Sequence, residues 1–172
     1  MSLHIRLVRL QDVAQLMAVE RSAAQLFRRQ PAWRFIADGD VMSAQQHAGF
    51  IARQSEWLAE SPEGEIAGFI AVLAQPADWH IAELSVAGDW QRRGVGRRLI
   101  AAVAAEAKRR GASRLTLTTF AEVPWNAPYY RRLGFRPIAA EHLTPALRRH
   151  LAEDLAHGFA ADSRCAMEFT LS

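Results

Sequence analysis

The sequence contains little cysteine, little lysine and no long apolar run. Its single cysteine, Cys165, excludes an internal disulfide and a cysteine-based zinc cluster. The six histidines show no ligand spacing with acidic or thiol partners, so we expect no structural metal. No apolar run approaches the roughly eighteen residues that span a bilayer, and the N-terminus has no signal-peptide pattern. We therefore expect a soluble, cytoplasmic protein with no membrane partner.

The high isoelectric point reflects arginine usage. The sequence pI is about 9.7, yet the formal net charge is only +3 and Lys108 is the single lysine. Arginines are spread along the chain with one modest cluster at residues 92–98, which a diphosphate ligand would explain, so we expect no nucleic-acid partner. The 172 residues, half of them hydrophobic, predict a single domain, residues 1–172, with one core.

Hydrophobic periodicity predicts an α/β domain. Strands are predicted from alternation and helices from apolar spacings of three and four residues. The predicted strands are 3–7, 56–60, 66–74, 80–86, 114–120 and 165–171, and the predicted helices are 13–19, 43–53, 94–110 and 145–157. Three strands in succession favour an antiparallel meander, whereas the strand, helix and strand of residues 81–120 imply a parallel pair. The sheet should therefore be mixed.

Residues 91–96, with the sequence Gln-Arg-Arg-Gly-Val-Gly, join a predicted strand to a long amphipathic helix. The first turn of a helix has backbone N–H groups without internal partners and a partial positive charge, and both favour a pyrophosphate. Gly94 and Gly96 would let phosphates approach the main chain, with Arg92, Arg93, Arg97 and Arg98 as flanking cations. A glycine pair before a helix can also be only a tight turn. Leu99 breaks the dinucleotide fingerprint, and no Gly-Lys-Ser/Thr occurs for a Walker A loop.

The stretch Gln91 to Gly96 resembles the Gln/Arg-x-x-Gly-x-Gly/Ala signature of the GCN5-related N-acetyltransferase (GNAT) superfamily, whose loop holds the pyrophosphate of acetyl-coenzyme A. Residues 126–135, Asn-Ala-Pro-Tyr-Tyr-Arg-Arg-Leu-Gly-Phe, are similar to the pattern that closes the GNAT core. The resemblance covers residues 3–138 and the strand near 164–171. It implies the GNAT fold: a mixed, mostly antiparallel sheet of six to seven strands, flanked by helices and splayed at the acetyl-coenzyme A cradle.

The resemblance also implies which residues bind the coenzyme. Backbone groups of the strand end would pair with the pantetheine arm like an added strand, and the family asparagine would contact the same arm. The implied set is Leu84, Ser85, Val86, Gln91, Arg92, Arg93, Gly94, Val95, Gly96, Arg97 and Asn126. The connection at 142–163 is longer than the short hairpin common in the family, and it either covers the acceptor site or forms a homodimer contact.

Two residues are candidates for acid and base catalysis. Tyr130 corresponds to the family tyrosine near the coenzyme sulfur, where it would act as general acid; the alternative role is a core aromatic before Gly-Phe, as expected for Tyr129. Glu83 is the candidate base, because it precedes the cradle on the strand face opposite Leu84. A solvated strand carboxylate is the alternative.

Other residues stay open as reserves or as pocket walls. Glu122 and Glu20 are the reserve bases, and Cys165 lacks an activating neighbour and is not expected to be a nucleophile. Acceptor specificity should come from the first helix and the loop after it. There Phe27, Trp33 and Phe35 would form an aromatic wall and Asp38 or Asp40 would attract a cationic amine, with Trp125 near the mouth; each could equally be a fold residue.

These expectations predict an enzyme that transfers acetyl from acetyl-coenzyme A directly to a primary amine of a small molecule, in a ternary complex and without a metal. Two alternatives remain. The acceptor could be a protein or peptide amine, or the chain could be a non-catalytic module that binds or senses acyl-coenzyme A.

Overall fold

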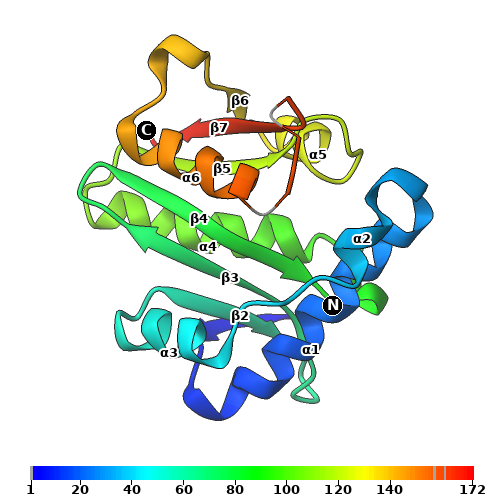
Figure 1. The fold of residues 1–172 in the computed structure, drawn as a ribbon. Coiled ribbons are helices and arrows are strands. Elements are labelled where there is room, and N and C mark those ends of the chain that lie inside the picture. Colours follow the sequence, from blue (N-terminus) through cyan, green and yellow to red (C-terminus); the bar gives the residue numbers. More distant parts are fainter. Residues whose placement is uncertain (1, 157, 161) are drawn as a thin grey trace. The chain divides into compact units, whose positions relative to one another are not determined.

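The computed structural model describes residues 2–156, 158–160 and 162–172 (Figure 1). The strands lie in the order β1 (His4–Leu7), β2 (Glu56–Glu60), β3 (Ile66–Ala74), β4 (Asp78–Val86), β5 (Arg114–Phe120), β7 (Arg164–Thr170) and β6 (Arg136–Pro137). The prediction of a mixed, mostly antiparallel sheet is confirmed. The chain forms two compact units. The first contains Met1–Ala74 and Ile81–Ala105, and the second contains Gln75–His80 and Glu106–Ser172. Strand β4, Asp78–Val86, contributes to both.

The first unit is built on antiparallel strands. β1 (His4–Leu7) pairs with β2 (Glu56–Glu60), and β2 pairs with β3 (Ile66–Ala74). A hairpin turn joins β2 to β3, with Gly64 at a φ of +84° and a 2.8 Å bond from Ser61 N–H to the Glu65 carbonyl. The helices of this unit are α1 (Val13–Ala24), α2 (Arg34–Ala37), α3 (Ala44–Ala52) and most of α4 (Val95–Arg109).

Helices α1 and α3 cover one face of β2 and β3, and α4 covers the other. Successive side chains of a strand point to opposite faces, and two neighbouring residues of β3 show this directly. The ring of Phe69 meets His47 of α3 with 5.4 Å between centroids, whereas a Cβ at Gly68 would face Val95 and Leu99 of α4. The apolar spacing of α1 accordingly buries Leu16 and its neighbours in a core cluster that consists of Val8, Leu16, Val19, Leu58, Ile66 and Phe69.

The segment after α1 is more ordered than the predicted loop. It contains 3₁₀ turns at Gln25–Arg29 and Pro31–Trp33, followed by the short helix α2. Proline at the first position of a helical turn has a suitable φ and loses no internal hydrogen bond, which explains why Pro31 begins a turn here. Pro and Gly mark loops in a sequence, and this is why the short helices were not predicted.

The second unit surrounds β5. The first three residues of β4, Asp78 to His80, run parallel to Arg114 to Thr116 at the start of β5 (Arg114–Phe120). β7 (Arg164–Thr170) pairs antiparallel along the whole of β5, and it also pairs with the two-residue strand β6 (Arg136–Pro137). Strand β6 was not predicted from the sequence because it is so short; Pro137 has no N–H to extend a ladder.

Helix α6 (Pro145–Ala156) begins at the predicted residue and packs on β5 and β7, and α5 (Ala127–Arg132) also belongs to this unit. The imidazoles of His80 and His150 stack with 3.9 Å between centroids and 5° between planes. His80 Nδ1 lies 2.9 Å from the Thr116 hydroxyl, and burial lowers the pKa of His80 to about 3. Arg164 Nε of β7 also donates to the Asp154 carboxylate of α6 at 3.0 Å. A neutral, buried imidazole thus helps to hold the inserted helix on the sheet.

Candidate functional site

The end of β4 lies unusually close to β3. A Cβ at Gly68 would come within 2.7 Å of the Ser85 carbonyl oxygen and 3.2 Å of Val95 Cγ1, both closer than ordinary contacts allow. Next to it, Ala87 N–H donates to the Ala67 carbonyl at 2.9 Å. Gly68 therefore lets β3, the end of β4 and the first turn of α4 approach one another. This role was not predicted from the sequence, although a glycine inside an apolar strand is a known signal of close backbone approach.

The chain between β4 and α4 forms a tight, internally bonded turn. Gln91 Nε2 donates to the Val86 carbonyl at 3.1 Å, and Trp90 is buried in a 3₁₀ turn at Gly88–Trp90. Arg92 has a φ of +64° and Gly94 a φ of +79°. Left-handed residues in such a turn are typical of backbone concavities that bind anions, and a non-glycine residue held there costs of order 1 kcal/mol or more.

Helix α4 begins directly after this turn, and its first N–H groups have no carbonyl of the helix itself to bond. Arg98 N–H donates to the Gly94 carbonyl at 3.1 Å, the bond that opens the helix. The three N–H groups before it, of Val95, Gly96 and Arg97, have no acceptor within the helix, and they lie at its positive end. First-turn N–H groups of this kind suit an anion, and binding of a diphosphate at the junction of β4 and α4 stays a prediction.

The arginines at this junction differ in their roles. Arg98, counted from the sequence as a flanking cation, donates to the Leu3 carbonyl at 3.0 Å and instead ties the start of the chain to α4. Arg93 lies over the Trp90 ring, 5.2 Å from its centroid. Within the described ranges, no salt bridge involves Arg92, Arg93 or Arg97, and all three are exposed.

The carboxylate of Glu83 is held by a neighbour on its own strand face. Ser85 Oγ donates to Glu83 Oε1 at 2.9 Å, as expected for side chains two residues apart on a strand. Ser85 is buried and Glu83 half-buried. The sequence assigned Ser85 a role through its backbone, and the structure adds a side-chain role in orienting Glu83.

The two reserve bases occupy different environments. Glu20 is half-buried, accepts a 2.9 Å bond from Met42 N–H, and has a pKa raised by burial. Close to it, His47 Nδ1 lies 2.7 Å from Glu56 Oε2 in a fully buried pair, and burial raises the pKa of Glu56. Glu122 is exposed. Glu20 thus anchors the loop before α3 to α1.

Asn126 and Tyr130 lie together in the second unit, at the start and middle of α5. Thr119 Oγ1 donates to Asn126 Oδ1 at 2.6 Å, which orients the amide so that its NH₂ group is the remaining donor. Tyr130 is half-buried, and its ring meets those of Tyr129 and Phe135 with 5.3 and 5.6 Å between centroids. The strand end and turn that hold the other predicted residues belong to the first unit.

The structure distinguishes the two acidic candidates for acceptor binding. Asp38 forms a surface ion pair with Arg28, whereas Asp40 lines a hollow that also contains Arg21. Among the aromatic candidates, Phe35 is 53% exposed, and Phe27, Trp33 and Trp125 are half-buried. Burial raises the pKa of the Cys165 thiol and keeps it protonated, which disfavours it as a nucleophile.

The described residues contain no group of three or more His, Cys, Asp or Glu side chains that could hold a metal ion. Among the same residues, none of the helices has the length and apolar character needed to cross a membrane.

Comparison with known proteins gives consistent matches. A family model described as "Acetyltransferase (GNAT) family" matches residues 14–135. N-acetylglutamate synthase from Neisseria gonorrhoeae, solved with coenzyme A and N-acetyl-glutamate, is similar over 100% of this chain with a TM-score of 0.74 and 19% identity, and the chain covers 36% of that protein.

Two further structures match over nearly their full length. The PaiA N-acetyltransferase from Thermoplasma acidophilum, solved with coenzyme A, has a TM-score of 0.75 and 16% identity, with 99% of each chain covered. A ribosomal-protein-alanine N-acetyltransferase from Escherichia coli has a TM-score of 0.69 and 18% identity, with 99% of this chain and 95% of that chain covered. At these identities the structural likeness concerns the fold.

Proposed function

The chain belongs to the acetyltransferase (GNAT) family, and we propose that it transfers acetyl from acetyl-coenzyme A directly to a primary amine of a small molecule. The observation that carries the proposal is the β4–α4 junction. There the left-handed residues Arg92 and Gly94 lead into a helix whose first three N–H groups lack an internal acceptor. The solved structures of two similar proteins contain coenzyme A, which supports acetyl-coenzyme A as the acetyl donor.

The residues at the junction fit the diphosphate of coenzyme A. The N–H groups of Val95, Gly96 and Arg97 would donate to its oxygens, and charge-assisted hydrogen bonds of this kind contribute about 1.5–3 kcal/mol each. Arg92 and Arg93 would add flanking charge from exposed positions. The cofactor-binding set expected from the sequence is kept as proposed: backbone at Leu84, Ser85 and Val86 for the pantetheine arm, the turn Gln91 to Arg97 for the diphosphate, and Asn126 for the arm.

Acyl transfer requires proton movements at both reacting groups. As the amine nitrogen bonds to the thioester carbonyl carbon and the carbon–sulfur bond breaks, the amine loses a proton and the leaving thiolate gains one. Glu83, oriented by Ser85 Oγ at 2.9 Å, would accept the amine proton. Tyr130 would donate to the thiolate, since a phenol is protonated at neutral pH. Backbone N–H groups at the end of β4 would stabilise the oxyanion.

Substitution of the proposed acid tests the mechanism. Tyr130→Phe should lower turnover more than tenfold and leave the affinity for acetyl-coenzyme A nearly unchanged, because it removes only the phenolic hydroxyl group and with it the transferable proton. Tyr129→Phe is the matched control and should retain turnover. An unaffected rate in Tyr130→Phe would remove this residue as the acid.

The proposed coenzyme A site, called the donor site below and formed by residues 84–86, 91–97 and Asn126, is tested separately by Gly96→Val. This variant should weaken coenzyme A binding, measured by calorimetry, because branched side-chain bulk is added at the first turn of α4. Normal binding would show that the site assignment is wrong.

The reaction class is tested by measuring release of free coenzyme A from acetyl-coenzyme A against a panel of amines, with products weighed by mass spectrometry. Turnover with small amines supports the proposal. Products formed only with peptides would move the acceptor to proteins, and saturable coenzyme binding without any product would support a sensing module instead.

A further inference from the structure

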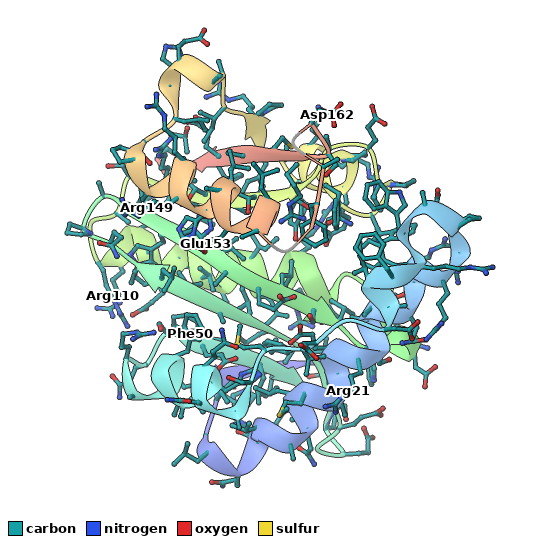
Figure 2. The ribbon with its side chains drawn as sticks, in the orientation of Figure 1. Arg21, Phe50, Arg110, Arg149, Glu153 and Asp162 are labelled. Atoms are coloured by element: carbon teal, nitrogen blue, oxygen red, sulfur yellow. The ribbon has the colours of Figure 1, made fainter. Side chains whose placement is uncertain are left out.

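The first unit contains a hollow of about 450 Å³ between α1 and the start of α3. A volume in this range suits a small organic ligand. Its lining includes Met17 and Arg21 of α1, Asp40 and Val41 of the connecting loop, and Ser43 and Gln46 at the start of α3. Arg21 is labelled on α1 in Figure 2. None of these residues belongs to the proposed donor site.

Hydrogen bonds hold the walls of the hollow in place. The loop is tied to α1 by the bond from Met42 N–H to the Glu20 carboxylate. At its end, Ser43 and Gln46 form a reciprocal capping box, with bonds of 3.1 Å from Gln46 N–H to Ser43 Oγ and 2.9 Å from Ser43 N–H to Gln46 Oε1. Gln25 Nε2 donates to the Ala37 carbonyl at 3.2 Å near the start of the loop. A site with fixed walls binds without a large ordering cost.

The hollow presents two opposite charges that do not neutralise each other. In the part of the chain that the structure describes, neither Arg21 nor Asp40 takes part in a salt bridge, although Asp38 in the same loop pairs with Arg28. Both side chains are exposed at an open hollow, and Arg21 also partly offsets the rise in the pKa of the neighbouring Glu20 carboxylate. Opposite charges at one hollow match a ligand that carries both signs itself. Arg21 would bind a carboxylate and Asp40 an ammonium group.

The hollow shares α1 with the proposed donor site. Ser22, the residue after Arg21, accepts a 2.8 Å hydrogen bond at Oγ from Gly88 N–H, in the turn that leads to the diphosphate residues. One helix therefore borders both the hollow and the turn. This continuity makes the hollow a candidate for the acceptor rather than for an unrelated ligand.

We propose that the hollow binds the amino-acid head group of a diamino acid and that the enzyme acetylates the second, side-chain amine. The proposal rests on the proposed acetyltransferase function. An ammonium group bound by Asp40 stays protonated and is not a nucleophile, so the acceptor needs another amine. Arg21 and Asp40 then select zwitterionic head groups over simple amines. In the reaction, the side-chain nitrogen gains the acetyl group, coenzyme A leaves as its thiol, and one proton passes from the amine to the base.

Three acceptors with a terminal amine on the same five-carbon chain test the two charges independently. They are L-lysine, cadaverine, which lacks the carboxylate, and 6-aminohexanoate, which lacks the α-ammonium. L-lysine should have the highest kcat/KM. Arg21→Gln should lower kcat/KM about tenfold for L-lysine and 6-aminohexanoate but leave cadaverine unchanged. Asp40→Asn should lower it about tenfold for L-lysine and cadaverine but leave 6-aminohexanoate unchanged.

Matched controls come from the same region of the chain. Asp38→Asn removes a carboxylate that pairs with Arg28 outside the hollow, and Arg29→Gln removes an exposed arginine nearby; both should behave as the parent protein. Product analysis should place the acetyl group on the side-chain nitrogen. The same result with L-ornithine would extend the class to a shorter side chain.

Two results would overturn the proposal while leaving the acetyltransferase function intact: equal kcat/KM for L-lysine and cadaverine, or equal losses for all three acceptors in each variant. If no amine is acetylated, the proposed function fails, and calorimetric binding of L-lysine decides the question of the hollow. Binding that weakens in Arg21→Gln and Asp40→Asn but not in Asp38→Asn supports the head-group site, and absence of binding to the parent protein refutes it.

Discussion

Replacing Gly68 with alanine tests whether the close approach of β3 to the end of β4 supports the donor site. The added Cβ would lie 2.7 Å from the Ser85 carbonyl oxygen, 3.2 Å from Val95 Cγ1 and 3.4 Å from Leu99 Cδ1. The first of these atoms is backbone and cannot rotate away. Either β4 or the start of α4 must therefore move.

The magnitude follows from opposing effects. Overpacking of this kind costs about 1–3 kcal/mol, while the lower chain entropy of alanine in the unfolded state returns about 0.4–1 kcal/mol. We expect Gly68→Ala to lower the free energy of unfolding by about 1–2 kcal/mol, or the melting temperature by roughly 2–8 °C. Because Ser85 and Val95 belong to the proposed coenzyme A site, coenzyme A affinity should also fall.

Gly49→Ala is the control, with the opposite expected sign. Gly49 lies inside α3, and its added Cβ would meet only the flexible end of Arg53, at 3.6 Å. Alanine in a helix interior is favoured over glycine by about 0.8–1.0 kcal/mol, so this variant should be more stable. Urea unfolding and coenzyme A calorimetry on both variants provide the data. Parent-like stability and affinity in Gly68→Ala would refute the steric argument.

Three further predictions concern hydrogen bonds and charge. Ser85→Ala, which removes the donor to Glu83, should lower kcat and shift the acidic limb of the pH profile to higher pH, with recovery in Ser85→Thr; an unchanged profile would contradict the orienting role. The pKa of His80 is about 3 in the folded protein and near 6.5 in the unfolded chain, so the unfolded state binds more protons between these two values. The free energy of unfolding should therefore fall as the pH drops from 6.5 toward 3, with a limiting slope of about 1.4 kcal/mol per pH unit. Urea unfolding at several pH values should show a shallower slope in His80→Gln. Asp12→Ala should cost about 2 kcal/mol in urea unfolding at pH 7, because the buried carboxylate accepts two bonds from Arg6, at 2.9 and 3.1 Å; a loss below 0.5 kcal/mol would mean that this ion pair is not stabilising.

Local features of the sequence predicted much of the fold. Helix α4 was predicted within one residue at each end, because its apolar spacing, its basic last turn and Gly111 at a φ of +87° are all encoded nearby in the chain. The Thr144-Pro145 start of α6 was equally local, and Thr144 Oγ1 accepts from Leu147 N–H at 3.2 Å. Strand β6 was missed because two residues do not show a period.

The candidate site was predicted less evenly. The turn before α4 was located because glycines, arginines and a helix start lie next to one another in the sequence, and its binding of a diphosphate stays a prediction. The partners of its side chains were not located: Arg98 bonds to Leu3 across 95 positions, and the donor to Asn126 is Thr119 on β5. Asp38 and Asp40 were equivalent in the sequence, and only folding placed one in an ion pair and the other in a hollow.

By itself, therefore, the sequence determined the family, the longer elements and the position of the turn before α4, since these depend on periodicity, capping and left-handed glycines within a few residues. The tertiary structure decided that Gly68 must be small, that Ser85 holds Glu83, and that Arg21 and Asp40 line one hollow. Such relations depend on which strand or helix packs against a residue from a distant part of the chain. The identity of the side chains limits which contacts can form, but the packing of the fold determines which of these contacts do form.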